Sequence, residues 1–150
     1  MNLECCVSER GTRWPEPGKA FFFRAPASAA EALAHLGVDC VCLANNHALD
    51  FGEEALQDTF DHLARVGIAW AGAGADVDRA RAPAVLRAGA FRLGVLSLCD
   101  HPEDFAAGPG RPGVAFADLE RRVPDWVRSA VRSVEADGVL VSPHWGPNMV

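Results

Sequence analysis

The hydrophobic and polar positions along the chain predict helices and strands in alternation. Ser28 is expected to cap a helix that runs to about residue 36, and Gly37 is expected to end it. Residues 38–43 are almost entirely apolar, which is typical of a buried parallel strand. A polar loop over residues 45–52 follows this strand.

A longer amphipathic helix is predicted after that loop. Glu53 and Glu54 stand in its first turn, where acidic side chains complement the positive end of the helix dipole, and Gly67 ends it. Its predicted buried stripe consists of Leu56, Phe60 and Leu63. Because these residues recur at helical spacing, one face of the helix is expected to cover the neighbouring strand.

The rest of the chain continues the alternation. The remaining predicted elements are strands over residues 68–71, 83–86, 91–98 and 138–142, a short helix near 77–81, and a helix from Pro124 to about 135. Residues 21–23 form either a short strand or an aromatic edge over the core, and residues 8–19 and 100–117 are predicted loops. This order indicates one α/β domain over residues 1–150, with a mostly parallel or mixed sheet.

Composition and charge narrow the possible partners. The 150 residues carry a formal net charge of −6, and acidic residues are spread along the whole sequence. This balance argues against nucleic acid or an anionic membrane surface as the main partner. No apolar stretch approaches the roughly 20 residues of a membrane span, and the first residues do not read as a signal peptide. Lys19 is the only lysine among the 14 basic Lys and Arg residues. We attribute this preference for arginine mainly to genome composition.

The five cysteines are not expected to form a disulfide framework, because their number is odd and their spacing irregular. Cys40 and Cys42 lie two residues apart in an apolar strand, so their side chains share one face of it. Two small core residues are the favoured interpretation, and a metal-binding pair is the alternative. A nucleophilic cysteine–histidine pair stays open, although no local motif supports one.

Polar side chains follow several predicted strands at their carboxyl ends, where functional groups gather in α/β sheets. These side chains are Asn45, Asn46 and His47 after the strand over 38–43, Asp100 and His101 after the strand over 91–98, His144 after the strand over 138–142, and Glu4 if residues 1–3 end a strand. Asn46 and His144 are therefore expected to lie together at one sheet edge. The two other histidines, His35 and His62, fall on predicted helices and are expected to be surface or packing residues.

The residue types at this edge suit a divalent metal. The carboxylate oxygen of Glu4, the amide oxygen of Asn46 and the imidazole nitrogen of His144 suit Mn²⁺, Fe²⁺ or Zn²⁺. A carboxylate can also bridge two cations held about 3.5–4 Å apart, as in two-metal phosphatases. His47 could instead donate a proton to a leaving oxygen.

Each of these residues also has a simpler interpretation. Asn-Asn-His after a strand is typical turn chemistry, because asparagine hydrogen-bonds its own backbone. His144 could be an ordinary loop histidine, and Glu4 could be a solvated acid. Asp50 could be a helix cap, and the pair Asp100–His101 could be a strand-end turn. The glycine pair over residues 72–74 resembles a fragment of a phosphate loop but lacks the third glycine.

One ten-residue segment resembles a family signature. Residues 43–52, Leu-Ala-Asn-Asn-His-Ala-Leu-Asp-Phe-Gly, resemble the Ala-Asn-Asn-His-x-x-Asp-aromatic-Gly signature of the CapA-type poly-γ-glutamate capsule synthesis proteins, members of the calcineurin-like metallophosphoesterase superfamily. Further matches follow in the family's order: Asn-Leu-Glu at 2–4, a Gly-Ile…Gly-x-Gly…Ala…Pro stretch from 67 to 83, and Ser-x-His-Trp-Gly at 142–146. The resemblance spans nearly the whole chain and implies part of a metallophosphoesterase-like α/β/β/α sandwich.

The resemblance implies a role for five residues. The metal ligands would be Glu4, Asn46 and His144, with Glu4 as a bridging carboxylate. They would bind two divalent ions of Mn, Fe or Zn. His47 would contact a phosphoryl-type oxygen as the general acid, and Asp50 would orient the loop that carries it. The superfamily's opening Gly-Asp motif and closing paired-histidine motif are absent from these residues. The chain is therefore expected to be a copy truncated at both ends, with an incomplete metal shell and unpaired strand edges.

The expected function is that of a CapA-like capsule synthesis protein with a metal-dependent, phosphoesterase-type hydrolase site. Its substrate would be a small molecule or a polymer such as poly-γ-glutamate, and its partner a capsule-synthesis complex. The alternative is a non-catalytic polymer-binding or assembly subunit, or an inactive truncated fragment of the same fold. Members of the family often work at the cell envelope.

Overall fold

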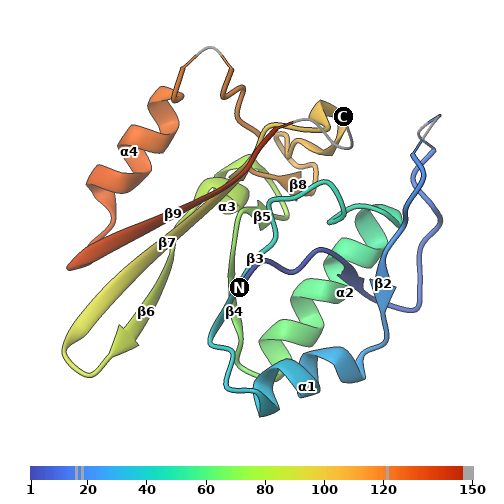
Figure 1. The fold of residues 1–150 in the computed structure, drawn as a ribbon, viewed down its shortest axis with the longest axis horizontal. Helices are drawn as coiled ribbons and strands as arrows, with labels where there is room; N and C mark the ends of the chain where they lie inside the picture. The colour runs from blue at the N-terminus through green and yellow to red at the C-terminus, as the bar shows by residue number, and fades with distance from the viewer. Residues whose placement is uncertain (16, 18, 121, 147–150) are drawn as a thin grey trace.

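The structure, a computed structural model, describes residues 1–15, 17, 19–120 and 122–146. It has the α/β composition that the sequence predicts (Figure 1). The helices are α1 (Ser28–His35), α2 (Gly52–Arg65), α3 (Val77–Arg81) and α4 (Asp125–Ser133), and η1 is a 3-10 turn at Glu103–Phe105. The strands are β1 (Cys6–Val7), β2 (Arg24–Ala25), β3 (Cys40–Cys42), β4 (Ala69–Ala71), β5 (Ala73–Gly74), β6 (Ala84–Ala88), β7 (Phe91–Cys99), β8 (Gly113–Val114) and β9 (Gly138–His144).

The strands pair into short sheets of parallel and mixed type. β3 and β4 are parallel, and residues 1–3 run beside β3, where the Leu3 amide donates to the Cys42 carbonyl at 3.0 Å. The longest sheet has the order β6-β7-β9, with β6 antiparallel and β9 parallel to β7. β1 pairs with β2 in parallel, and β5 pairs with β8 antiparallel.

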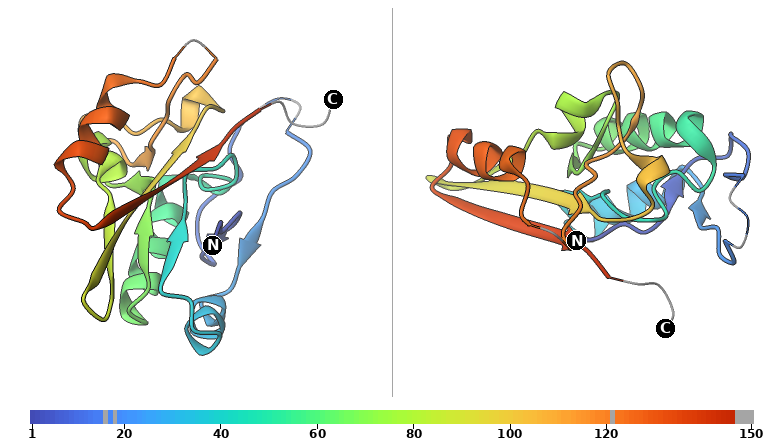
Figure 2. Two further views of the ribbon diagram at one scale, coloured as in Figure 1. Left: turned by 60° about the vertical axis from the view of Figure 1, so that its left-hand side comes forward. Right: turned by 90° about the horizontal axis from the view of Figure 1, so that it is seen from above.

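The core lies in layers between these sheets and the helices. One face of β3 packs on α2 through Val41 and Leu56, both fully buried. The opposite face of β3 meets β7 through Cys42 and Val95, and the next β7 residue, Leu96, packs towards α4. Figure 1 shows the resulting order of α4, β7 with β9, β3 with β4, and α2 across the molecule, and the left view of Figure 2 shows α2 behind β3 and β4. This order is compatible with part of an α/β/β/α sandwich.

Most predicted elements are present, with ends shifted by one or two residues. The short helix over 77–81 is found as α3, and the predicted stripe of α2 is buried in full. Of the two interpretations of residues 21–23, the strand is wrong, because the strand is formed by the next two residues, in β2. Those aromatic residues instead form an edge over the core, where the Phe23 ring lies 4.3 Å from the His47 ring, centre to centre.

Two other local predictions are wrong. Ser28 is the first residue of α1 and not its cap, since Ala27 holds the cap position and no side chain bonds the first amides. The predicted loop over 100–117 contains η1 and β8, and the glycine stretch after β4 contains a further short strand, β5. β5 and β8 are two-residue strands stabilised by pairing across the chain, which local sequence does not reveal.

Gly72 explains part of the glycine stretch that resembled a phosphate loop. Its φ is +88°, and a side-chain carbon placed there would lie 2.6 Å from Ala44 Cβ and 2.7 Å from Ser97 Cβ. The residue therefore lets the end of β4 pass close to both β7 and the loop after β3. Its role in the structure is close packing of the two central sheets.

Replacing Gly72 by alanine is expected to lower the free energy of unfolding by about 2–4 kcal/mol, because overpacking adds to the cost of a positive φ. Gly89→Ala is the matched control. Gly89 also has a positive φ, of +62°, but nothing lies within 4 Å of its missing side chain. That substitution is expected to cost about 1 kcal/mol. Equal losses in urea denaturation would show that the clash at Gly72 is absent.

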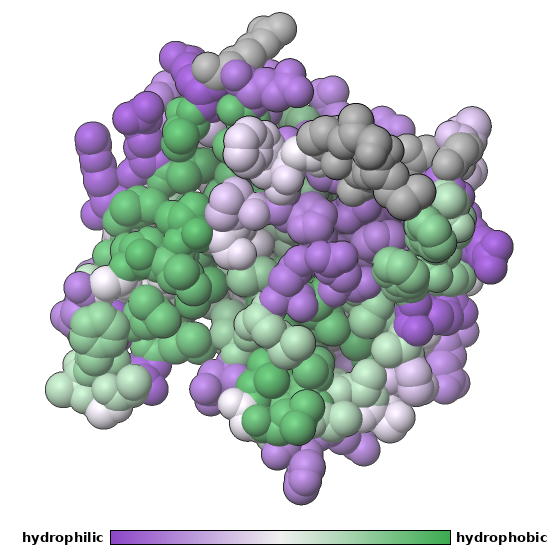
Figure 3. Space-filling model, in the orientation of Figure 1, coloured by the Kyte–Doolittle hydropathy of each residue, from purple (hydrophilic) through white to green (hydrophobic). Residues whose placement is uncertain are grey.

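The β9 side of the molecule carries an exposed apolar strip. Among the described residues β9 pairs only with β7, and its Leu140 and Val141 side chains are exposed. Figure 3 shows hydrophobic surface at the left of the view, in the region of β9. Within the described residues, the side of β9 that faces away from β7 is also an unpaired strand edge.

Candidate functional site

The loop between β3 and α2 is fixed by Asn45, which is fully buried. Its Oδ1 accepts a hydrogen bond from the His47 amide at 3.0 Å, and its Nδ2 donates to the Leu3 carbonyl at 2.9 Å and to Asn2 Oδ1 at 3.1 Å. The turn chemistry expected of asparagine therefore belongs to Asn45. The side chain of Asn46 is left to make a different contact.

Asn46 meets His144 across the two central sheets. Asn46 Oδ1 accepts a hydrogen bond from His144 Nε2 at 3.0 Å, although 98 positions separate the two residues. His144 is the last residue of β9 and not a loop residue after it, and its Nδ1 lies 3.7 Å from Glu4 Oε1. The Glu4 carboxylate also accepts from Asn2 Nδ2 at 2.6 Å. The three predicted ligands thus lie together, on two adjacent sheets instead of one.

His47 is held by a buried carboxylate. Its Nδ1 donates to Asp50 Oδ2 at 2.8 Å, and the Asp50 side chain is fully buried. This bond leaves His47 Nε2 as the nitrogen that can face a substrate oxygen. The Phe23 amide donates to the same Asp50 oxygen at 2.6 Å. Asp50 therefore orients the histidine, and it makes no side-chain cap to α2.

Lys19 completes this cluster, and sequence analysis missed it. Its Nζ lies 3.1 Å from Asp50 Oδ1 and donates a hydrogen bond to the Asn46 carbonyl at 2.7 Å. The Lys19 side chain is only 9% exposed and lies near the rings of Phe22 and Phe105. A buried carboxylate needs a positive partner, because an unpaired buried charge is costly. Its being the only lysine in the chain was the one signal available.

Asp100 and His101 lie beside His144. Asp100 bonds His101 Nδ1 through one carboxylate oxygen and accepts the Gly146 amide at 3.2 Å through the other. The ring centres of His101 and His144 are 5.6 Å apart. The pair thus forms the strand-end turn that was expected, and this turn adjoins the candidate metal residues.

The electrostatics of His144 favour its neutral form. Burial is the largest cause and lowers the pKa of this imidazole, the Glu4 carboxylate opposes that shift, and the neighbouring His101 adds to it. A neutral imidazole is the form that binds a metal ion. The environment of His144 is therefore suited to a ligand.

Three of the cysteines are poor nucleophiles in this fold. Burial raises the pKa of Cys99 to about 12 and the pKa of Cys6 and Cys40 to about 11, so these thiols stay protonated at neutral pH. Cys40 and Cys42 pack in the apolar layer between the two central sheets, as the core interpretation expected. The chemistry of the candidate site is therefore assigned to its polar residues and not to these three cysteines.

The donor types at the site fit a divalent cation, while their number is small. A carboxylate, an amide oxygen and an imidazole approach one another at Glu4, Asn46 and His144. In the described part of the chain, no group of three or more histidine, cysteine, aspartate or glutamate side chains is placed to hold a metal ion. A metal site here would depend on the amide oxygen of Asn46 in addition to Glu4 and His144.

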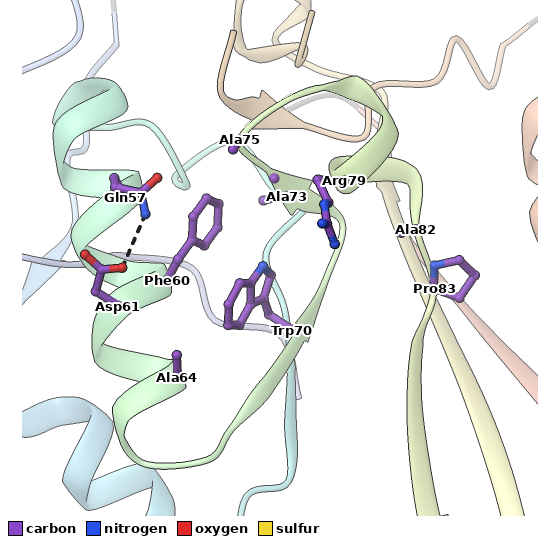
Figure 4. A pocket seen from close by; sticks show the side chains of 11 residues that line it. Gln57, Phe60, Asp61, Ala64, Trp70, Ala73, Ala75, Arg79, Ala82 and Pro83 are labelled. Carbon is purple, nitrogen blue, oxygen red and sulfur yellow. Dashed lines mark hydrogen bonds between the residues drawn. The ribbon is translucent and has the colours of Figure 1, made fainter. Parts of the chain in front are cut away.

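A separate pocket of about 410 Å³ lies between α2, β4 and α3 (Figure 4). Phe60 and Trp70 stack along it with ring centres 5.1 Å apart, and Figure 4 shows Gln57 bonded to Asp61 on one side with Arg79 opposite. None of the candidate metal residues lines this pocket. The candidate site is therefore assigned to the Asn46–His144 region.

The whole chain matches one family model. The model described as "Bacterial capsule synthesis protein PGA_cap" matches residues 1–150. The chain belongs to the PGA_cap family. This membership confirms the resemblance carried by residues 43–52 and the three flanking motifs.

Relatives of the PGA_cap chain are longer proteins. A probable polyglutamine synthesis accessory protein of Mycobacterium tuberculosis is 37% identical over 157 residues, which cover 99% of this chain and 41% of that protein. The PGA biosynthesis protein CapA of Bacillus subtilis is 32% identical over 105 residues, or 69% of this chain and 27% of that protein. An uncharacterised protein of Sinorhizobium fredii is 33% identical over 145 residues, or 85% of this chain and 31% of that protein. The chain thus spans about two fifths of the mycobacterial relative.

Within the described residues, no helix combines the length and the apolar character that crossing a lipid bilayer requires.

Proposed function

We propose that the protein acts in the synthesis of a bacterial capsule polymer of poly-γ-glutamate type and carries a metal-dependent, phosphoesterase-type hydrolase site. The PGA_cap family and the names of the mycobacterial and Bacillus relatives support the capsule-related role. The observation that carries the site is the 3.0 Å contact between Asn46 Oδ1 and His144 Nε2. A buried amide and a half-buried imidazole from distant parts of the chain meet there, next to the buried His47–Asp50 pair.

The proposed metal residues are Glu4, Asn46 and His144. A bound divalent metal supplies Lewis-acid polarisation of a phosphoryl oxygen and activation of water. Glu4 would contribute a carboxylate to hold the metal, and Asn46 and His144 would contribute one oxygen and one nitrogen. Asn45 holds the loop in place, so that Asn46 does not need to reorganise on binding.

His47 is the proposed general acid. Its Nε2 donates a proton to the oxygen that leaves when the phosphorus–oxygen bond breaks, and the imidazole then regains a proton from solvent. Asp50 holds the ring through Nδ1 and so fixes the direction of Nε2. Lys19 balances the charge of Asp50, and Phe23 covers one side of the imidazole. The chain thus positions its acid with buried, paired groups.

The test is hydrolysis of an aryl phosphate by the protein expressed from its full coding sequence. Activity is expected with Mn²⁺, to be lost with a chelator, and to return when Mn²⁺ is added back. Asn46→Ala and His144→Ala should each lower it by roughly 100-fold, because each removes a metal donor. His35→Ala changes an exposed residue on α1 and is the control that should keep full activity. Hydrolysis that ignores both the chelator and these substitutions would overturn the proposed site.

A second candidate function is a non-catalytic accessory role. The mycobacterial relative is named an accessory protein, and the exposed apolar strip of β9 offers a surface for assembly. Cosedimentation with poly-γ-glutamate in the absence of any metal-dependent hydrolysis would favour this function over the first.

A further inference from the structure

His101 has the environment of a metal-binding histidine. Its Nδ1 is bonded to the Asp100 carboxylate, which fixes both the tautomer and the direction of the ring. Its Nε2 is buried and has no hydrogen-bond partner among the described residues. Metal-binding histidines characteristically donate their second nitrogen to a carboxylate in this way. The unsatisfied Nε2 is therefore a candidate donor to a ligand that the protein itself does not supply.

The position of His101 relative to His144 fits a shared cation. Two imidazoles that bind one ion through nitrogen at about 2.1 Å have ring centres about 5–6 Å apart. The ring centres of His101 and His144 are 5.6 Å apart, at an interplanar angle of 38°. His144 in turn contacts Asn46 Oδ1 at 3.0 Å, so a nitrogen pair and an amide oxygen lie within one small region.

Asp100 makes hydrogen bonds both to His101 and to the segment that carries His144. One of its carboxylate oxygens holds His101, and the other accepts the amide of Gly146, in the turn directly after His144. The Asp100 amide also donates to the His144 carbonyl at 3.2 Å. A strand-end turn alone explains the backbone contacts. It does not explain a partly buried imidazole whose Nδ1 is fixed and whose inaccessible Nε2 has no partner among the described residues.

We propose that His101 is a metal-binding residue, with its Nε2 bound to the same divalent cation as His144 and its ring fixed by Asp100. The inference rests on the metal site of the proposed function and adds a nitrogen donor to it. A donor set of two imidazoles and an amide oxygen favours a cation that accepts nitrogen, such as Zn²⁺ or Fe²⁺, over Mg²⁺ or Ca²⁺.

The test measures metal binding directly, without activity. In protein labelled with ¹⁵N-histidine, addition of Zn²⁺ is expected to shift the Nε2 resonance of His101 together with a ring-nitrogen resonance of His144. By calorimetry, His101→Phe, which keeps a ring against His144, should weaken Zn²⁺ binding at least 10-fold. Asp100→Asn should weaken it about 10- to 100-fold, as expected for loss of a supporting carboxylate. His35→Phe is the matched control and should bind Zn²⁺ as the unchanged protein does.

The outcomes separate this inference from the proposed function. If the His144 resonance moves while His101 does not, and His101→Phe binds Zn²⁺ normally, the role of His101 is overturned and the proposed metal site stands. If Zn²⁺ moves neither histidine in the unchanged protein, the metal site itself is overturned, and His101 with it. The resonance measurement needs no substitution, so a variant that fails to fold does not affect it.

Discussion

Replacing His47 by alanine is expected to lower kcat for aryl phosphate hydrolysis about 100- to 10,000-fold, the usual contribution of a positioned general acid. The reason is geometric. His47 is almost fully buried, its Nδ1 is bonded to Asp50 at 2.8 Å, and the Phe23 ring packs on it at 4.3 Å. A histidine placed in this way has one nitrogen free for chemistry and little freedom to move.

The substitution should act on the chemical step and leave metal binding almost intact, because His47 itself is not among the proposed ligands. Zn²⁺ titration of His47→Ala should therefore resemble that of the unchanged protein, whereas kcat falls. His47→Gln keeps a polar side chain of similar length but cannot act as an acid, so it should be as inactive as the alanine variant. Full activity in either variant, with an unchanged melting temperature, would remove His47 from the mechanism.

The Asn-Asn-His loop shows how far sequence alone could go. Its residue types were consistent both with a turn and with a metal site, and the structure assigns each asparagine a different contact. Asn45 makes the turn through its bond to the His47 amide, and Asn46 faces His144. The two interpretations were not exclusive, but side-chain direction in a loop is not encoded in a local pattern.

Lys19 marks what sequence could not predict. It is 31 positions before Asp50 in a loop rich in glycine and proline, and no periodic pattern places it. Burial of Asp50 makes a cation necessary, but that burial is known only once the fold is known. His101 is a similar case, since a histidine after a strand fits a turn until its unpartnered Nε2 is seen.

The long elements were predictable because their hydrophobic periods are strong. The stripe of α2 and the apolar run of β7 identify a helix and a strand with little help from context. β5 and β8 were missed because two-residue strands carry no period, and only their pairing stabilises them. The packing role of Gly72 could not be predicted either, because the atoms that leave no room for a side chain there belong to Ala44 and Ser97.

Replacing Asp50 by alanine is expected to lower the free energy of unfolding by about 3–5 kcal/mol, the usual cost of removing one partner of a buried charge pair. The substitution leaves the Lys19 ammonium, only 9% exposed, without its carboxylate. It also leaves the Phe23 amide and His47 Nδ1 without their acceptor. Urea denaturation at neutral pH measures the loss. The exposed pair of Arg65 and Glu31, 3.9 Å apart, gives the control, because Glu31→Ala should change stability by less than about 0.5 kcal/mol.

A double-mutant cycle separates the charge pair from the other bonds of Asp50. Lys19→Met alone should also be strongly destabilising, because it leaves the fully buried Asp50 carboxylate without a positive partner. The double variant Lys19→Met with Asp50→Ala should lose less stability than the sum of the single variants, since neither charge is then left unpaired. The loss of stability that remains in the double variant measures the hydrogen bonds that Asp50 accepts from the Phe23 amide and His47 Nδ1. Additive losses would mean that Lys19 and Asp50 do not stabilise each other, and that the loop carrying His47 is held by its hydrogen bonds alone.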